Sequence, residues 1–520
     1  MFKLIRIKNE GKNMLNTDRI YIRLLLVSIL IILLLYSFLG EKQPYNDGLG
    51  WDGRLYYEMC NNSISSIANN GYSSYYVQRF LPFACVNIVQ QIFGYNHTMV
   101  CMMLVIFVAL MVGVLAFFKI SDCLKLKNNV EIIAFGFLFY NKEVLRCGYS
   151  PFQTDMFALV VGICLFYFFL KKQKKFMMCI AFLGAFIWQS IWPIACVLLA
   201  LPWDSYNVTQ ERRLITIGEK GTEVVKGLFI IIPILSLAYL IKICLKYDVP
   251  ISDYGEVVPY FWSETSILGL VLSTITLMGY ISYLLYPIHF DIFTAIKHLW
   301  KSIKFLEIVS AILLFVLMNL LIHFLANKSI DNPSSLIFTI RRIMWEPLTF
   351  PMKFLETHLL TFGLVIIFFL IYYKRIIGIA QKHSLGYLFC IIYIVVFGSQ
   401  TETRFIINML PFMVFAIANV MNEFNFRKWV APVLVVSQLI LSHFWFHINT
   451  SEILMTKITE DDLTYLKYPL QRMFEFTGPW QSINNYYKWI SIFAMILVVF
   501  YIFHKKKWLY IENISMQKDE

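Results

Sequence analysis

The stretch that decides the fold is "FMMCIAFLGAFIWQSIWPIACVLLALP", residues 176–202, a run of 27 residues without a charged side chain. It follows "KKQKK" at 171–175, and Arg212 and Arg213 come soon after it. Because lysine and arginine gather in the cytoplasmic loops of membrane proteins, a single crossing would place the basic residues of every later loop outside. Two helices of about 13 residues, hinged near Gln189–Pro193, return those loops to the cytoplasm. Each would be about 20 Å long, shorter than the membrane core of about 30 Å, so we predict a pair of short membrane helices here.

Composition indicates an all-α polytopic membrane protein. The chain has 520 residues, of which 58% are hydrophobic and only 15% charged, whereas soluble domains carry about 25% charged residues. Apolar runs of spanning length recur along the whole chain, and we predict about fourteen transmembrane helices, within a range of eleven to fourteen. The net charge of +12 is spread over short loops between these runs, which excludes a nucleic-acid partner in favour of a lipid bilayer.

The loop charges assign sides to the segments of a single integral membrane domain over 1–520. A basic cytoplasmic N-terminus (1–19) precedes the first span, and a long first extracytoplasmic loop (40–96) follows it. The last extracytoplasmic loop covers 448–488, and "HKKK" opens a cytoplasmic tail at 504–520. We also expect one span over 357–373. Since no loop is long enough to hold a globular domain, the chemistry is expected at the outer membrane face.

The first outer loop holds two candidate site residues on predicted interfacial helices. Apolar residues recur at helical spacing after Asp52-Gly53 and again around "YVQRFLP" at 76–82, as in amphipathic helices lying at a membrane surface. Asp52 offers a general base, and Arg79 offers a clamp for a phosphate. Two structural alternatives stay open: Asp52 as a helix cap, and Arg79 as an arginine that reaches the membrane surface.

Further polar residues lie in the later outer loops. Asp155 stands at the outer mouth of the fourth span, as a site residue or a helix cap. Arg341 and Arg342 form a basic pair that favours an anchor to anionic lipid. Glu402 and Arg404 stand at the outer end of another span, where charges usually face a cavity.

The chain lacks the motifs of soluble-nucleotide and zinc chemistry. It contains no GxxxxGK phosphate loop, no HExxH and no GxSxG, and its cysteines show no zinc-ligand spacing. No cofactor is therefore assigned with certainty. A divalent cation, Mg²⁺ or Mn²⁺, is left open.

Several motifs in order resemble those of the GT-C superfamily, membrane glycosyltransferases that use polyprenyl-phosphate sugars. "WDGRLYY" (51–57) is similar to the D-G-x-x-Y element of a bacterial subset, and "YYVQRFLPFA" (75–84) to its Y-x-x-R-x-L-P element. Asp155, "TRFIINMLPF" (403–412) and the short helix pair are similar to later elements. The motif-level resemblance covers roughly the first 200 residues, and beyond them it rests on topology and one late arginine.

The resemblance implies a mechanism and a set of site residues. A sugar would pass from a polyprenyl-phosphate donor to the hydroxyl of a glycan or lipid acceptor, with Asp52 as catalytic base and Arg79 and Arg404 on the donor phosphate. Asp47 lies close enough to Asp52 to leave the identity of the base open, although the aromatic pattern that follows Asp52 favours that residue. The residues expected to bind substrate are Asp47, Arg54, Tyr56, Tyr57, Asp155 and Gln189.

The high Ile, Lys and Asn content suggests a bacterial gene. The resemblance then implies a transferase of the cell envelope, in the inner membrane with its active site outside, and the loop charges place both termini in the cytoplasm. The acceptor class would be O-antigen, another cell-envelope polysaccharide or lipopolysaccharide. Two alternatives remain. One is an O-antigen or capsule polymerase, whose working loops we would expect in the second half of the chain. The other is a flippase or transporter of lipid-linked sugars, a class that often shows internal repeats and charges in mid-membrane.

Overall fold

A computed structural model shows an all-helical protein. It describes residues 2–42, 49, 52–69, 71–94, 97–201, 215–250, 266–286, 305–327, 329, 336–445, 478, 481, 483–506, 508 and 509. Within these ranges no β-strand is present. The predicted all-α class is therefore confirmed for the part of the chain that can be described.

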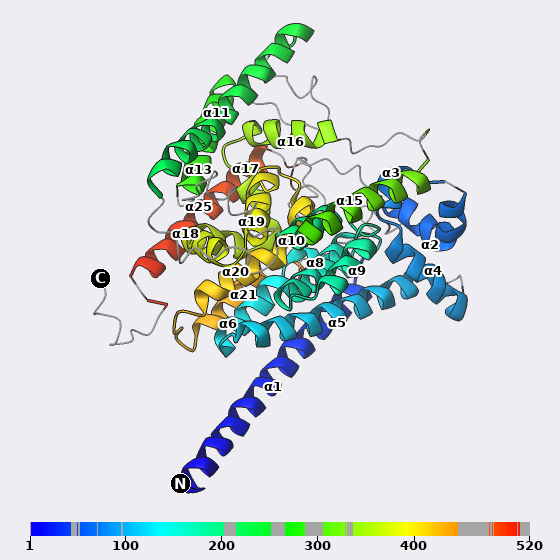
Figure 1. Cartoon of the computed structure of the whole chain (residues 1–520), viewed down its shortest axis with the longest axis vertical. Helices are drawn as coiled ribbons and strands as arrows, with labels where there is room; N and C mark the ends of the chain where they lie inside the picture. Colours follow the sequence, from blue (N-terminus) through cyan, green and yellow to red (C-terminus); the bar gives the residue numbers. More distant parts are fainter. Residues whose placement is uncertain are drawn as a thin grey trace.

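The helices follow the apolar runs of the sequence, with short connections between many of them (Figure 1). In chain order they are α1 (Phe2–Leu39), α2 (Gly53–Ala68), α3 (Ser74–Val77), α4 (Leu81–Phe93), α5 (Thr98–Leu124), α6 (Asn128–Phe139), α7 (Lys142–Leu145), the 3₁₀ helix η3 (Arg146–Gly148), α8 (Asp155–Leu170), α9 (Lys174–Gly184), α10 (Ile191–Ala200), α11 (Ile215–Tyr247), α13 (Ile267–Leu285), α15 (Phe305–Leu325), α16 (Leu336–Thr349), α17 (Lys353–Phe362), α18 (Val365–His383), α19 (Leu385–Phe397), the 3₁₀ helix η6 (Thr403–Met409), α20 (Leu410–Met421), α21 (Val430–Ser442) and α25 (Ile483–Lys505).

Seven helices in the described ranges are long and apolar enough to cross a membrane, or eight if one sharply bent pair counts as a span. Six further apolar helices have only 10 to 17 residues. These helices indicate a polytopic membrane protein. The predicted number of fourteen spans is not confirmed, because these six helices are shorter than a bilayer core requires.

The charge-free run 176–202 is divided between two short helices. Most of it lies in α9 and α10, which have 11 and 10 residues. The helix axis is interrupted at 185–190, where the chain turns. The two helices pack against each other, and α10 also packs against α15 and α19.

The segment expected to form one span over 357–373 is bent by 113° between α17 and α18. Gly363 sits at the bend with φ +67°, a backbone conformation that favours glycine. The side chain of Gln438 on α21 satisfies the broken backbone: its Nε2 donates to the carbonyl of Phe362, and its Oε1 accepts from the amide of Leu364. Because Gln438 is fully buried, the bend is a built feature of the interior.

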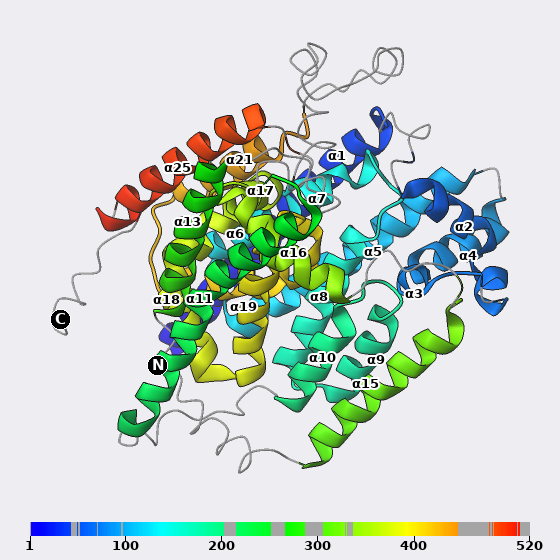
Figure 2. The same cartoon turned by 90° about the horizontal axis from the view of Figure 1, so that it is seen from above.

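The segment formed by η6 and α20 lies inside the bundle, where both pack against α8 and α19 and α20 also packs against α6 and α18. This segment is mostly buried, whereas fewer than half of the residues in each of the other six candidate spans are buried. Gly162 on α8 allows η6 to approach closely, since a methyl group there would overlap the carbonyl oxygen of Asn408. The helices α2, α3 and α4 form a separate group at one side (Figure 2).

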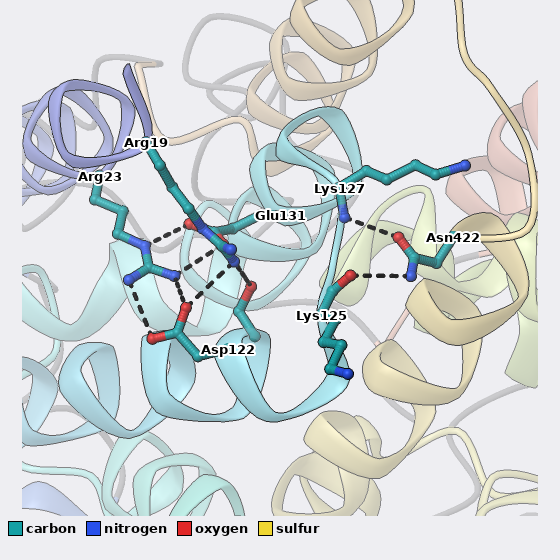
Figure 3. A network of polar contacts seen from close by, with 8 residues as sticks. Arg19, Arg23, Asp122, Lys125, Lys127, Glu131 and Asn422 are labelled. Atoms are coloured by element: carbon teal, nitrogen blue, oxygen red, sulfur yellow. Dashed lines mark hydrogen bonds and ion pairs between the residues drawn. The ribbon is translucent and has the colours of Figure 1, made fainter. Parts of the chain in front are cut away.

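At one end of the bundle, charged side chains tie α1 to α5 and α6 (Figure 3). Glu131, only 1% exposed at the start of α6, accepts from the guanidinium groups of Arg19 and Arg23. Arg23 also donates to Asp122 at 2.6 Å. We call this cluster, with Ser121 beside Glu131, the Glu131 end.

The opposite end of the bundle, which we call the Asp52 end, carries α2, α3 and α4. We call these three the first-loop helices. The chain of α1 runs alongside α6 and α7, so that Arg19 lies by Glu131 while Ser37 donates to the carbonyl of Leu145. Helix α5 has 27 residues and is therefore about 40 Å long. It runs from Thr98, which contacts Gln90 of α4, to Asp122 at the Glu131 end.

Candidate functional site

The first-loop helices form a small packed unit of their own. The ring of Tyr56 on α2 is stacked on Phe83 of α4, with centroids 4.6 Å apart. The Asn87 side chain donates to the carbonyls of Cys60 and Asn61. These contacts join α2 to α4, and the segment that holds Asp52 and Arg79 is fixed by them.

Asp52 precedes α2, but its carboxylate does not cap the helix. No hydrogen bond joins its side chain to the amides of the first turn, so the cap interpretation of Asp52 is not supported. Instead, Oδ2 lies 3.8 Å from Nη1 of Arg404, and the two side chains are 38% and 33% exposed. This contact is an ion pair longer than a hydrogen bond, and its carboxylate is open to a ligand.

Arg79 is buried in an aromatic enclosure. It is 3% exposed, and its guanidinium lies 3.6 Å from the ring centroid of Tyr75 and 5.0 Å from that of Trp188. Its Nη1 donates to the carbonyl of Tyr75 at 3.1 Å. No carboxylate pairs with it among the described residues. A buried cation without an anion is costly, which makes this position suited to an anionic ligand.

The break between α9 and α10 holds the Arg79 segment in place. The amide of Leu81 donates to the carbonyl of Phe186 in the break, and the Phe80 and Phe186 rings meet edge to face. On the other side, Ser190 donates to Asn408 of η6 at 3.2 Å. Gln189 lies half-buried in this break. The run that decides the topology thus also connects the segments that carry Arg79 and Arg404.

Behind Arg404 lies a row of buried charges. Arg404 donates through Nε to Glu402, which also accepts from Arg342 of α16. Arg342 is 7% exposed, so its interpretation as a lipid anchor is wrong, whereas Arg341 is exposed. Burial alone would raise the pKa of Glu402, but Arg404 and Arg342 outweigh it and lower the pKa to about 2.

Asp155 begins α8 and faces a small cavity lined also by Glu143, Arg146, Ser150 and Gln153. Asp155 is 3% exposed, and its Oδ1 has no hydrogen-bond partner. Arg146 pairs with Glu143 at 2.7 Å. Burial, together with the charge of Asp155, raises the pKa of Glu143, although Arg146 opposes the shift. Both carboxylates act electrostatically on Arg404.

Tyr56 links the parts of the site electrostatically. Burial raises the pKa of its phenol, and the charges that act on it are those of Arg79, Asp52 and Arg404. Burial and Asp52 likewise raise the pKa of Tyr76 to about 12. The charges of Asp52, Arg79 and Arg404 therefore act on one group of tyrosines, and Asp155 acts electrostatically on Arg404.

The remaining predicted site residues lie differently. Arg54 points to the surface and pairs with Glu58 at 3.5 Å, with 74% of its side chain exposed. Tyr57 packs edge to face on Phe152, which brings α2 to the loop before Asp155. The ring of Tyr56 belongs to the core of the first-loop unit. Asp47 lies outside the described residues.

Sequence reasoning did not assign Glu402, Arg342, Glu346, Tyr75 or Trp188 to the site. The spacing of Arg342 and Glu346, four residues apart on a helix, signals a pair, and the two are in contact. The partnership of Arg342 with Glu402 has no local signal, because it joins residues 60 positions apart. The approach of Trp188 to Arg79 is likewise a tertiary contact.

In the described ranges no group of three or more histidine, cysteine, aspartate or glutamate side chains is arranged to hold a metal ion. The divalent cation therefore stays a prediction. No protein-family model, no curated protein and no solved structure matches this chain.

Proposed function

We propose that this protein is a membrane glycosyltransferase that moves a sugar from a polyprenyl-phosphate donor to an acceptor hydroxyl of a cell-envelope glycan or lipid, such as O-antigen or lipopolysaccharide. The proposal includes a GT-C-like build with about fourteen helices crossing or entering the membrane. It also places the Glu131 end and both termini in the bacterial cytoplasm, and Asp52 at the outer face of the inner membrane.

The observation that carries the proposal is Arg79. Its guanidinium is buried between Tyr75 and Trp188 and lacks a carboxylate among the described residues. A phosphate would supply the missing negative charge, and arginine binds phosphate through two parallel hydrogen bonds. Arg79 lies in the turn between α3 and α4, and a position of this turn at the membrane interface would suit a donor whose prenyl tail stays in lipid.

Asp52 supplies the complementary group. In the proposed reaction the acceptor oxygen attacks the anomeric carbon, and Asp52 takes the hydroxyl proton. The bond between the anomeric carbon and the phosphate oxygen breaks, and the prenyl phosphate leaves with one more negative charge. Arg79 stabilises this charge as it builds. A positioned base contributes about 10²–10⁴-fold to such a reaction.

The test uses the purified full-length protein in proteoliposomes with a panel of synthetic undecaprenyl-phosphate hexoses. We expect release of undecaprenyl phosphate by the wild type, and loss of both donor binding and release in Arg79→Met. Arg341→Met, which removes an exposed cation, serves as the control. No release from any donor, or full release by Arg79→Met, would contradict the proposal.

Two outcomes separate the alternatives. Movement of a lipid-linked sugar across the bilayer without a new glycosidic bond would indicate a flippase. In cells, Asp52→Asn is compared with Arg341→Ala while glycan chain length and side-branch sugars are scored separately. Shortened glycan chains with intact side-branch sugars in either variant would indicate a polymerase. Loss of side-branch sugars in Asp52→Asn alone supports the transferase.

A further inference from the structure

Five side chains of alternating charge form a row from α16 to the start of α2: Glu346, Arg342, Glu402, Arg404 and Asp52. The first three are buried, with exposures of 3%, 7% and 9%. The last two are about one-third exposed. The row therefore leads from the interior of the bundle to the accessible carboxylate of the proposed site.

The buried part of the row is firmly held. Arg342 uses Nε for Glu346 and Nη1 for Glu402, so its planar fork joins two carboxylates. The other oxygen of Glu346 accepts from the amide of Thr401 at 2.5 Å and from its hydroxyl at 2.8 Å. Glu402 is therefore bound by a cation, Arg342, that is itself held by Glu346.

Two carboxylates compete for Arg404. Glu402 holds its Nε in a direct hydrogen bond, while Nη1 stops 3.8 Å from Asp52. A guanidinium that moved 1 Å towards Asp52 could form a short bidentate pair, which would occupy both oxygens of the carboxylate. Such a pair would leave Asp52 a poor proton acceptor, since a bound arginine stabilises the charged form.

We propose that Glu402 and Arg342 are positioning residues of this site, which hold Arg404 away from direct contact with Asp52 and thereby keep Asp52 available as a base. Helix α16 is then part of the site, although no residue of it reaches Asp52. The inference rests on the proposed function and assigns Arg404 to the orientation of Asp52 as well as to the donor phosphate.

Substitution of Glu402 and substitution of Arg342 should shift the pH dependence of the reaction in opposite directions. Glu402→Gln removes the charge that draws Arg404 back, so Arg404 approaches Asp52 and the acid limb of the pH–rate profile moves to lower pH. Arg342→Met leaves Glu402 with Arg404 as its sole cation of the row, so Asp52 experiences more negative charge and the limb moves to higher pH. Other groups that act on Asp52 or Arg404 are unchanged in both variants: Tyr56, Tyr75, Tyr76, Glu143 and Asp155.

The experiment measures kcat and KM for an undecaprenyl-phosphate hexose against pH in both variants. We expect shifts of about half a pH unit in opposite directions, with a lower kcat. Arg341→Met on the same helix should match the wild type. Shifts of the same sign, or no shift in either variant, would overturn the inference.

A second measurement does not depend on catalysis. Thermal unfolding of Arg342→Met, Asp52→Asn and the double variant forms a cycle between two residues that do not touch. We expect the shifts in Tm to be non-additive, because the charges between them transmit the coupling, whereas independent distant sites add. If the wild type transfers no sugar, the proposed function fails, but this cycle still tests whether Arg342 and Asp52 are coupled. Additive shifts in Tm would overturn the inference.

Discussion

The two ends of the bundle use charged side chains in different ways. At the Glu131 end, one buried carboxylate is held by two arginines, and a second carboxylate, Asp122, pairs with both of them (Figure 3). At the Asp52 end, Arg79 has no carboxylate among the described residues, and Asp155 has an unbonded buried oxygen. Asp52 itself stands off from Arg404 at 3.8 Å.

The difference distinguishes a cluster of charges that stabilises the fold from a ligand-binding site. Buried polar groups in folded proteins are almost always satisfied, and at the Glu131 end that satisfaction holds three helices together. Incomplete satisfaction at the other end is compatible with stability only where a ligand or solvent completes it. Perturbed and unpaired ionisable groups are accordingly found at functional sites.

The largest effect is expected from Asp52→Asn. The amide cannot accept the proton of an acceptor hydroxyl, so transfer should fall by about 10²–10⁴-fold. Stability should change little, since the side chain of Asp52 makes no capping hydrogen bond to its helix. Sugar transfer and thermal unfolding are measured on the same preparation, with Glu58→Gln as an exposed carboxylate control on α2. Full activity of Asp52→Asn would remove the distinction between the two ends.

Glu131→Gln should act on the fold. It leaves Arg19 and Arg23 without their buried partner, and the loss of one member of a buried pair costs about 3–5 kcal/mol. Asp122→Asn, at a position 47% exposed, should cost less than about 1 kcal/mol. Denaturant unfolding checks both values. If Glu131→Gln is destabilised no more than Asp122→Asn, the charge cluster at the Glu131 end does not stabilise the fold in the proposed way.

Acid should weaken the Asp52 end through Glu402. Its pKa is lowered from 4.5 to about 2, so the ionised carboxylate stabilises the folded state above about pH 4.5. That contribution is lost as the pH falls towards 2. Unfolding temperature is followed from pH 6 to pH 2 in the wild type and in Glu402→Gln, which lacks this titration. Identical profiles in the two proteins would count against a charged Glu402 in the folded state.

The smallest effect is expected from the surface pair of Arg54 and Glu58. Both side chains are mostly exposed, and such pairs contribute about 0–1 kcal/mol. Arg54→Ala should therefore leave stability nearly unchanged. If it nevertheless abolished transfer, Arg54 would contact substrate from the surface, and the site would extend beyond the residues that the structure brings together.

Local pattern predicted much of this fold. The positions of α1, α5, α8, α13 and α15 follow from apolar runs, and the division of 176–202 follows from loop charge. The bend at Gly363 was not predicted, because its cause is the side chain of Gln438, 75 positions later in the chain. The short α6 and α21 also show that an apolar run alone does not specify a full membrane crossing.

The sequence by itself determined the class, an all-α polytopic membrane protein, and the helical segments. The reason is that the length of an apolar run and the distribution of charge are local properties of the chain. It also singled out Asp52, Arg79 and Arg404 as individual candidates. Only the tertiary structure decided that Arg79 is buried without a carboxylate among the described residues, and that Glu402 separates Arg342 from Arg404. The reason is that the pairing of a charge depends on which distant segment reaches it, and no periodicity in the sequence encodes that contact.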